Sequence, residues 1–141
     1  MKTKQVQYMP DDPVLVFRAA LTVRRQMIVD QQEIVRRKPE AFNTPVIKSA
    51  LKRSEDDLRR VTDHLRRIFD GNPAIPSERR TILGHLDYHI RGFQCHLNHR
   101  RMELVKARNK YMMRELNAAL ARLDDLNVAH PENTFDLIGL F

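Results

Sequence analysis

The amino-acid sequence predicts an all-α protein, a three-helix antiparallel bundle with a long third helix that either kinks or protrudes. With 4 Gly and 7 Pro in 141 residues, the chain lacks the turn residues that an all-β fold needs. Apolar residues recur at three- and four-residue spacing along three stretches, as in amphipathic helices. The expected organisation is an N-terminal arm at 1–10, a helical domain at 11–127 and a tail at 128–141.

The first helix is expected at about 12–38. Asp12 followed by Pro13 is typical of a helix start, and Pro39 stops the helix after a basic last turn. Two apolar rows follow helical spacing, which predicts burial on more than one side of its first half. The rows are Val14, Phe17, Leu21, Ile28, Val35 and Val16, Ala20, Val23, Met27, Ile34.

The second helix is expected at about 45–70. Thr44 and Pro45 repeat the start signal, and Asp70-Gly71 is typical of a helix end. Its apolar residues keep a heptad alternation that only Ser54 interrupts, which predicts one face packed in a bundle. These residues are Ile47, Leu51, Leu58, Val61, Leu65 and Ile68.

The third helix is expected at about 77–127, with Ser77 as its N-cap. Its apolar face changes after Tyr111, so we expect two packing environments. The first half packs on the other helices, and the half from Met112 onward packs on a fold-back, a second copy or a partner. The first face comprises Leu86, Ile90, Phe93, Leu97, Leu104, Ala107 and Tyr111; the second comprises Val105, Met112, Leu116, Ala119, Leu123 and Leu126.

The charge and the cysteine content indicate the chemistry of the partner and the compartment of the protein. The formal net charge is +7, but residues 124–141 hold four acidic and no basic residues, so 1–123 carry 25 basic and 14 acidic side chains, or +11. A basic body indicates contact with a polyanion or an acidic protein. One cysteine, no signal peptide and no membrane-length apolar run predict the cytoplasm, or a virus particle made there.

Basic pairs recur every seven residues on the solvent face of the second helix. Such a stripe suits a nucleic-acid backbone. The alternative is a solvated face in which Glu55, Asp56 and Asp63 form ion pairs with the arginines four residues later. The candidate nucleic-acid-binding residues are Lys52, Arg53, Arg59, Arg60, Arg66, Arg67, Arg100 and Arg101.

Histidines and the cysteine give no catalytic pattern. His85 and His89 have the spacing that lets two imidazoles share a metal, but a zinc site needs further ligands. We therefore expect no metal or other cofactor, and keep these two as a weak metal candidate. Cys95 and His96 are adjacent on a helix and point about 100° apart, so no nucleophile–base pair is expected.

The C-terminal tail combines acidic and large apolar residues, as docking peptides do. In type it is similar to the acidic-apolar terminal peptides by which replication and late-transcription proteins of bacteria and phages bind a clamp or partner. The alternative is a tail that folds back on the bundle. The candidate partner-binding residues are Met112, Leu116, Leu123, Phe135, Leu137, Ile138, Leu140 and Phe141.

Together these features predict a non-enzymatic helical adaptor or assembly protein with the profile of a small phage protein. It would bind a protein partner or another copy through the second half of its long helix and its tail. A sequence-independent nucleic-acid-binding protein is the first alternative. A small helical enzyme or a histidine-site metal protein is the second. No membrane and no small-molecule substrate are expected.

Overall fold

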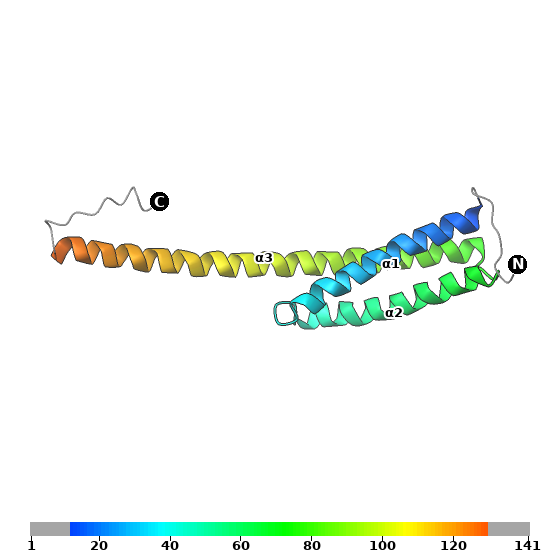
Figure 1. The fold of residues 1–141 in the computed structure, drawn as a ribbon, viewed down its shortest axis with the longest axis horizontal. Coiled ribbons are helices and arrows are strands. Elements are labelled where there is room, and N and C mark those ends of the chain that lie inside the picture. The colour runs from blue at the N-terminus through cyan, green and yellow to red at the C-terminus, as the bar shows by residue number, and fades with distance from the viewer. Residues whose placement is uncertain (1–11, 130–141) are drawn as a thin grey trace, which may run out of the picture. The chain divides into compact units, whose positions relative to one another are not determined.

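A computed structural model describes residues 12–129, and within that range the chain forms three α-helices and no strand. They are α1 (Pro13–Arg37), α2 (Pro45–Phe69) and α3 (Pro76–Ala129), labelled in Figure 1. The all-α prediction and the long third helix are confirmed. The chain divides into two compact units, one ending at Arg100 and one beginning at Arg101. We call them unit 1 and unit 2. Residues 1–11 and 130–141, and with them nearly all of the expected arm and tail, lie outside the described range.

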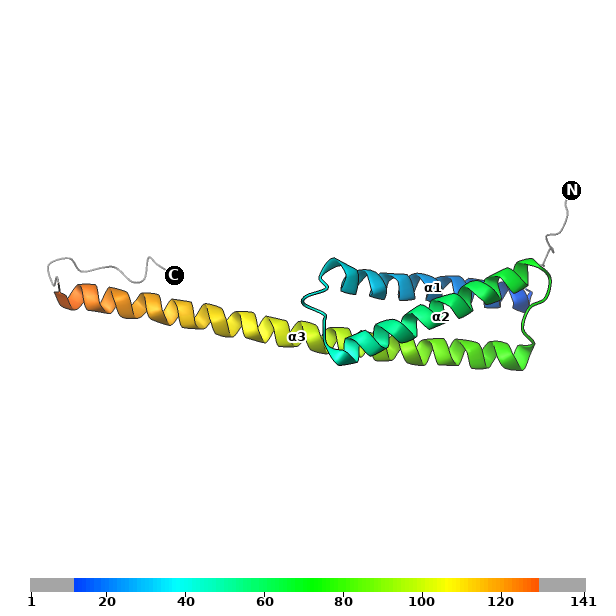
Figure 2. The same ribbon diagram turned by 90° about the horizontal axis from the view of Figure 1, so that it is seen from below.

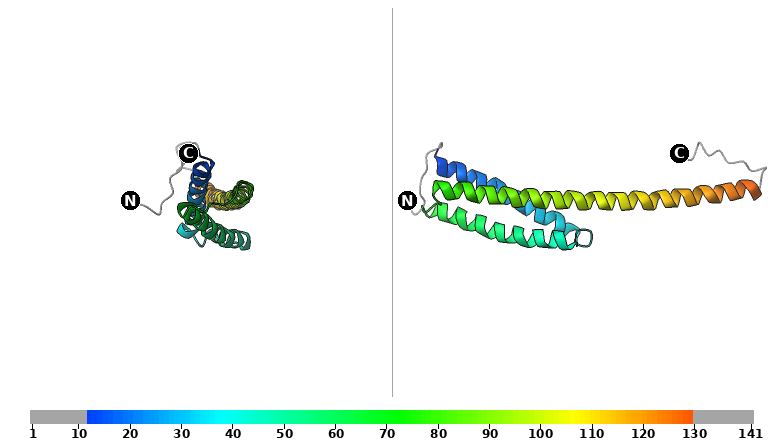
Figure 3. Two further views of the ribbon diagram at one scale, coloured as in Figure 1. Left: turned by 90° about the vertical axis from the view of Figure 1, so that its right-hand side faces the viewer. Right: turned by 180° about the vertical axis from the view of Figure 1, so that it is seen from behind.

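Unit 1 is a bundle of α1, α2 and the first part of α3. The three segments lie side by side and alternate in direction along the chain, as Figure 2 and the end-on view in Figure 3 show. Short connections at 38–44 and 70–75 suffice because each helix ends near the start of the next. The expected antiparallel bundle is therefore present.

All three helices begin with a proline at the first helical position, where its missing N–H is no loss. The first two have the predicted caps. Asp12 Oδ1 accepts from the Val14 N–H at 2.7 Å, and Thr44 Oγ1 accepts from the Ile47 N–H at 3.3 Å.

The predicted N-cap of the third helix was wrong by two residues. Ser77 already lies inside α3, and the Ile75 carbonyl accepts the first helical hydrogen bond from the Arg79 N–H at 2.9 Å. The fixed φ of Pro76 is suited to the first turn, so the helix begins there rather than after Ser77.

The predicted end of the second helix is confirmed. Gly71 takes φ 77°, the left-handed conformation that glycine adopts at little cost. The Asn72 N–H reaches the Arg67 carbonyl at 2.8 Å, and the Gly71 N–H reaches the Ile68 carbonyl at 3.0 Å. These two bonds form a Schellman motif, which satisfies carbonyls that the end of α2 would leave without partners.

The core of unit 1 consists of two hydrophobic clusters. They hold the first predicted row of α1, the heptad face of α2 and the α3 residues up to Leu97. The larger contains Val14, Phe17, Leu21, Ile28, Val61, Ile68, Ala74, Leu86 and Ile90. The smaller contains Val35, Phe42, Ile47, Ala50, Phe93 and Leu97.

The predicted burial of a second row on α1 was wrong for three of its five residues, whereas Ile34 packs against the smaller cluster. Val16, Val23 and Met27 are 45–63% exposed, because α2 and α3 cover only the side of α1 that carries Phe17 and Leu21. Periodicity identifies two apolar faces, but it does not say how many neighbours a helix has.

A layer of hydrogen-bonded polar side chains separates the two clusters along α1 and α2, and His89 of α3 joins this layer. Gln32 Nε2 donates to Ser54 Oγ at 3.1 Å, and Ser54 Oγ donates to the Leu51 carbonyl at 2.7 Å. Gln31 Nε2 donates to the Ile90 carbonyl at 2.8 Å. We call Gln31, Gln32, Ser54, Asp57 and His89 the polar layer.

Asp57 is the most costly member of the polar layer to bury, because it is a carboxylate and its residue is only 2% exposed. Its Oδ2 lies 2.7 Å from His89 Nδ1, and its Oδ1 lies 3.4 Å from Arg60 Nη1. One carboxylate thus connects α2 to α3 and to the next turn of its own helix.

Two further contacts fix the helices of unit 1 at either side of this layer. Arg24 donates from Nε and Nη2 to the two carboxylate oxygens of Asp87, at 2.8 and 3.0 Å, and so joins α1 to α3 in a bidentate pair. Arg100 Nε donates to the Ala41 carbonyl at 2.7 Å, which holds the α1–α2 connection against α3.

Replacing Asp57 by Ala is expected to lower the free energy of unfolding by about 3 kcal/mol, because its partners lose a buried anion. Denaturant titration followed by circular dichroism measures this. Replacing the exposed Glu55 by Ala, two residues away, should change it by less than about 0.5 kcal/mol. Equal losses in the two variants would contradict a special role for Asp57.

Candidate interaction surfaces

The part of α3 in unit 2 carries an apolar face that no described residue covers. Eight positions alternate by three and four residues from Met102 to Leu126, the a and d spacing of a coiled coil. Five of the large apolar side chains on this face are 38–60% exposed. We call the eight residues the α3 seam: Met102, Val105, Asn109, Met112, Leu116, Ala119, Leu123 and Leu126.

Three of the predicted partner-binding residues, Met112, Leu116 and Leu123, belong to the α3 seam. The other five, Phe135, Leu137, Ile138, Leu140 and Phe141, lie outside the described residues. Sequence reasoning missed Met102 and Asn109, although continuing the seven-residue spacing of Leu123 and Leu116 toward the N-terminus would have found both.

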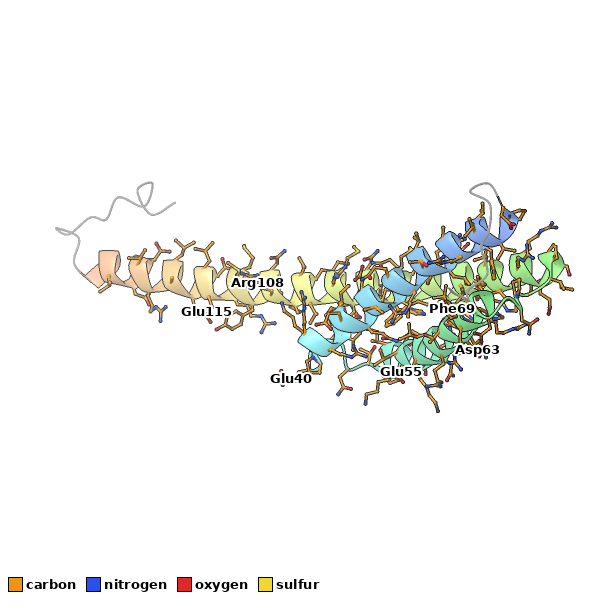
Figure 4. The ribbon with its side chains drawn as sticks, turned by 45° about the vertical axis from the view of Figure 1, so that its right-hand side comes forward. Glu40, Glu55, Asp63, Phe69, Arg108 and Glu115 are labelled. Carbon is orange, nitrogen blue, oxygen red and sulfur yellow. The ribbon has the colours of Figure 1, made fainter. Side chains whose placement is uncertain are left out.

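Figure 4 labels two charged side chains of unit 2, Arg108 and Glu115. These two occupy equivalent heptad positions beside the α3 seam, one heptad apart. Unit 2 therefore has an apolar stripe with charged residues along one edge, the pattern of a helix that packs against another helix.

The basic row of α2, which we define as Lys52, Arg53, Arg59, Arg60, Arg66 and Arg67, is largely exposed. Three members of the basic row have partners on α2 itself or in the connection that follows it. Arg59 pairs with Asp56, Arg60 pairs with Asp57, and Arg67 Nε donates to the Asn72 carbonyl at 3.3 Å. The predicted ion pairs with the acidic residues four positions earlier were wrong for Arg59 and Arg60. Each of these arginines instead pairs with the aspartate three positions earlier. Glu55 and Asp63 are labelled beside this row in Figure 4.

The remaining members of the basic row, Lys52, Arg53 and Arg66, have no carboxylate partner among the described residues. The other two predicted nucleic-acid residues lie at the unit boundary. Arg100 is half-buried against the Ala41 carbonyl, and Arg101 is exposed. The structure thus places three cations of α2 where a polyanion could reach them.

The two histidines of the metal candidate lie in different surroundings. His89 faces Asp57 in the polar layer, whereas His85 is exposed. Within residues 12–129, no group of three or more His, Cys, Asp or Glu side chains is arranged to hold a metal ion. Cys95 is an exposed free thiol. His89 is therefore explained by its role in helix packing.

His64 on α2 is a residue that sequence reasoning missed. Its Nδ1 is buried without a hydrogen-bond partner among the described residues, and its ring meets Phe17 edge-on with centroids 6.4 Å apart. It lines an open hollow of about 390 Å³. The other lining residues are Ser77, Glu78, Thr81 and Ile82.

Burial lowers the pKa of His64 below its ordinary value of 6.5, and the positive charge of Arg67 lowers it further. The carboxylates of Asp63 and Glu78 act in the opposite direction without overcoming burial. A neutral imidazole is therefore the form that the folded protein prefers. No signal in the sequence distinguishes this histidine from the exposed ones, because the cause is the packing of α1 and α3 around it.

In comparisons with known proteins, no protein-family model, curated protein or solved structure matches this chain. Among the described helices, none has an apolar stretch long enough to cross a membrane.

The folded protein should lose stability as the pH falls below about 6.5, in part through His64. Its pKa is lower in the folded than in the unfolded chain, so acid protonates the unfolded state first and favours it. Denaturant titrations at several pH values should show a smaller slope of unfolding free energy against pH for His64→Leu. His85→Leu, on an exposed position, should keep the parental slope; the same slope in all three proteins would refute the assignment.

Proposed function

We propose that this chain is a non-enzymatic helical adaptor or assembly protein. Unit 1 is the folded scaffold, and unit 2 is the attachment surface through which it binds a protein partner or another copy. The observation that carries this proposal is the exposed α3 seam. An exposed stripe of large apolar side chains on one face of a helix is typical of a protein-binding surface.

The remaining side-chain chemistry supports a scaffold rather than an enzyme. The carboxylates that contact basic groups across helices, Asp57 and Asp87, serve to join α2 and α1 to α3. A cofactor or small-molecule substrate has no part in the proposal. The free thiol of Cys95 favours a reducing compartment, so we place the protein in the cytoplasm, or in a particle assembled there if its source is a phage.

The basic row of α2 supplies a second contact in this proposal, to a nucleic-acid backbone or an acidic protein surface. Lys52, Arg53 and Arg66 are exposed on one helix and lack carboxylate partners among the described residues. Each phosphate contact of this kind contributes affinity that falls with salt and reads no sequence. Sequence-independent nucleic-acid binding is accordingly the second candidate function.

Photo-cross-linking inside the cells that make the protein tests the attachment surface. A photo-reactive residue in place of Leu116 should form protein adducts, because this position lies in the middle of the α3 seam. The same residue in place of Ala121, exposed on the opposite side of the helix, should form several-fold fewer. Equal yields at the two positions, or no adduct at Leu116, would remove the basis of the proposal.

Fluorescence anisotropy with a short DNA duplex tests the second candidate. The triple variant Lys52→Ala, Arg53→Ala, Arg66→Ala should bind at least about 10-fold more weakly, and the slope of log affinity against log salt should fall by about 2–3. A matched variant with the same loss of charge elsewhere, Arg18→Ala, Arg25→Ala, Arg80→Ala, should bind like the parent. If both variants bound DNA equally weakly, the affinity would depend on net charge in general and not on the basic row.

A further inference from the structure

The α3 seam is long enough to form a coiled coil. It spans residues 102–126, or three and a half heptads, and about 37 Å at 1.5 Å per residue. Met102, Asn109, Leu116 and Leu123 take a positions. Val105, Met112, Ala119 and Leu126 take d positions. Met113 and Leu120 lie at e positions and widen the apolar stripe on one edge.

Asn109 is the only polar member of the α3 seam, and it restricts what can cover the seam. Against a wholly apolar surface its amide would be buried without a partner, which costs about 1–3 kcal/mol. Opposite another Asn109, each amide can donate to and accept from the other. A single Asn at an a position is the device by which two-stranded parallel coiled coils fix register and strand number.

We propose that the α3 seam is covered by a second copy of this chain, in a parallel, in-register, two-stranded coiled coil. This rests on the proposed function, since it names the partner of the same attachment surface. In register, Asn109 meets Asn109 and every apolar seam residue meets its equivalent.

An antiparallel pair is disfavoured by the same residue. Aligning the whole seam antiparallel pairs a positions with d positions symmetrically about residue 114, so Asn109 would face Ala119. The methyl group offers the amide no hydrogen bond. The parallel arrangement is the one that satisfies Asn109 without shortening the contact.

The charges beside the seam give this arrangement a distinctive salt dependence. Residues 101–114 contain five basic side chains and one acidic side chain, and in a parallel pair the two sets lie at the same level. The g position Arg101 also comes near the e position Lys106 of the other strand. Because salt screens such repulsion, dimerisation should strengthen with salt. An acidic hetero-partner would show the opposite dependence.

Sedimentation equilibrium of the full chain tests self-association directly. The parent should have twice the 16.6 kDa chain mass, with a dissociation constant that falls as salt rises. Leu116→Asp should raise that constant at least about 100-fold, because it buries a charge in the seam. Ala121→Asp adds the same charge outside the seam and should leave the dimer intact. Circular dichroism should show both variants to be as helical as the parent.

Disulfide trapping tests the strand direction. In a Cys95→Ser background, Met102→Cys should cross-link readily to itself in a parallel dimer. A mixture of Met102→Cys and Leu126→Cys proteins should form no mixed disulfide above the level of random collision. Preferential cross-linking between positions 102 and 126 would overturn the parallel arrangement.

The outcomes separate this inference from the proposed function. A monomeric parent at every salt concentration overturns self-association. A mass of three or four chains overturns the two-stranded arrangement, and a monomer that dimerises only after removal of residues 130–141 identifies the tail as the occupant. None of these results affects the adducts expected at Leu116, which another protein would also give.

Discussion

The arrangement of unit 1 depends on the contact between the buried carboxylate of Asp57 on α2 and His89 on α3. Apolar side chains alone allow two helices to slide by a turn and still make contacts. A carboxylate that is 2% exposed does not, because any shift of α2 along α3 that removes His89 takes away the partner of this buried anion on the other helix. With Gln31 and Gln32 in the same layer, all three helices are held in one register.

The core of unit 1 ends on α3 at the level where α1 ends and α2 begins. Leu97 is fully buried, Arg100 reaches the Ala41 carbonyl, and from Arg101 onward the chain belongs to another unit. The two core clusters of unit 1 contain no residue after Leu97. This separation is the physical reason to regard the α3 seam as a surface for something else, and it is what the adaptor proposal and the dimer proposal share.

Identical residue types take on different roles through their surroundings. His89 is fixed by a carboxylate, His64 is desolvated beside Phe17 and prefers to be neutral, and His85 faces solvent. The arginines of α2 divide in the same way. Arg60 supports the buried Asp57, whereas Arg66 has no carboxylate partner among the described residues and remains available to an external anion.

The sequence by itself determined the three helices, two of their N-caps and the Gly71 stop, because capping groups and apolar periodicity act within a few residues. It also identified Met112, Leu116 and Leu123 as members of one face. Only the tertiary structure decided that Val16 and Val23 stay exposed, that His89 serves a carboxylate 32 residues away, and that the buried face of α3 ends at Leu97 rather than Tyr111. These depend on which helices meet, and such long-range pairing leaves no local signal.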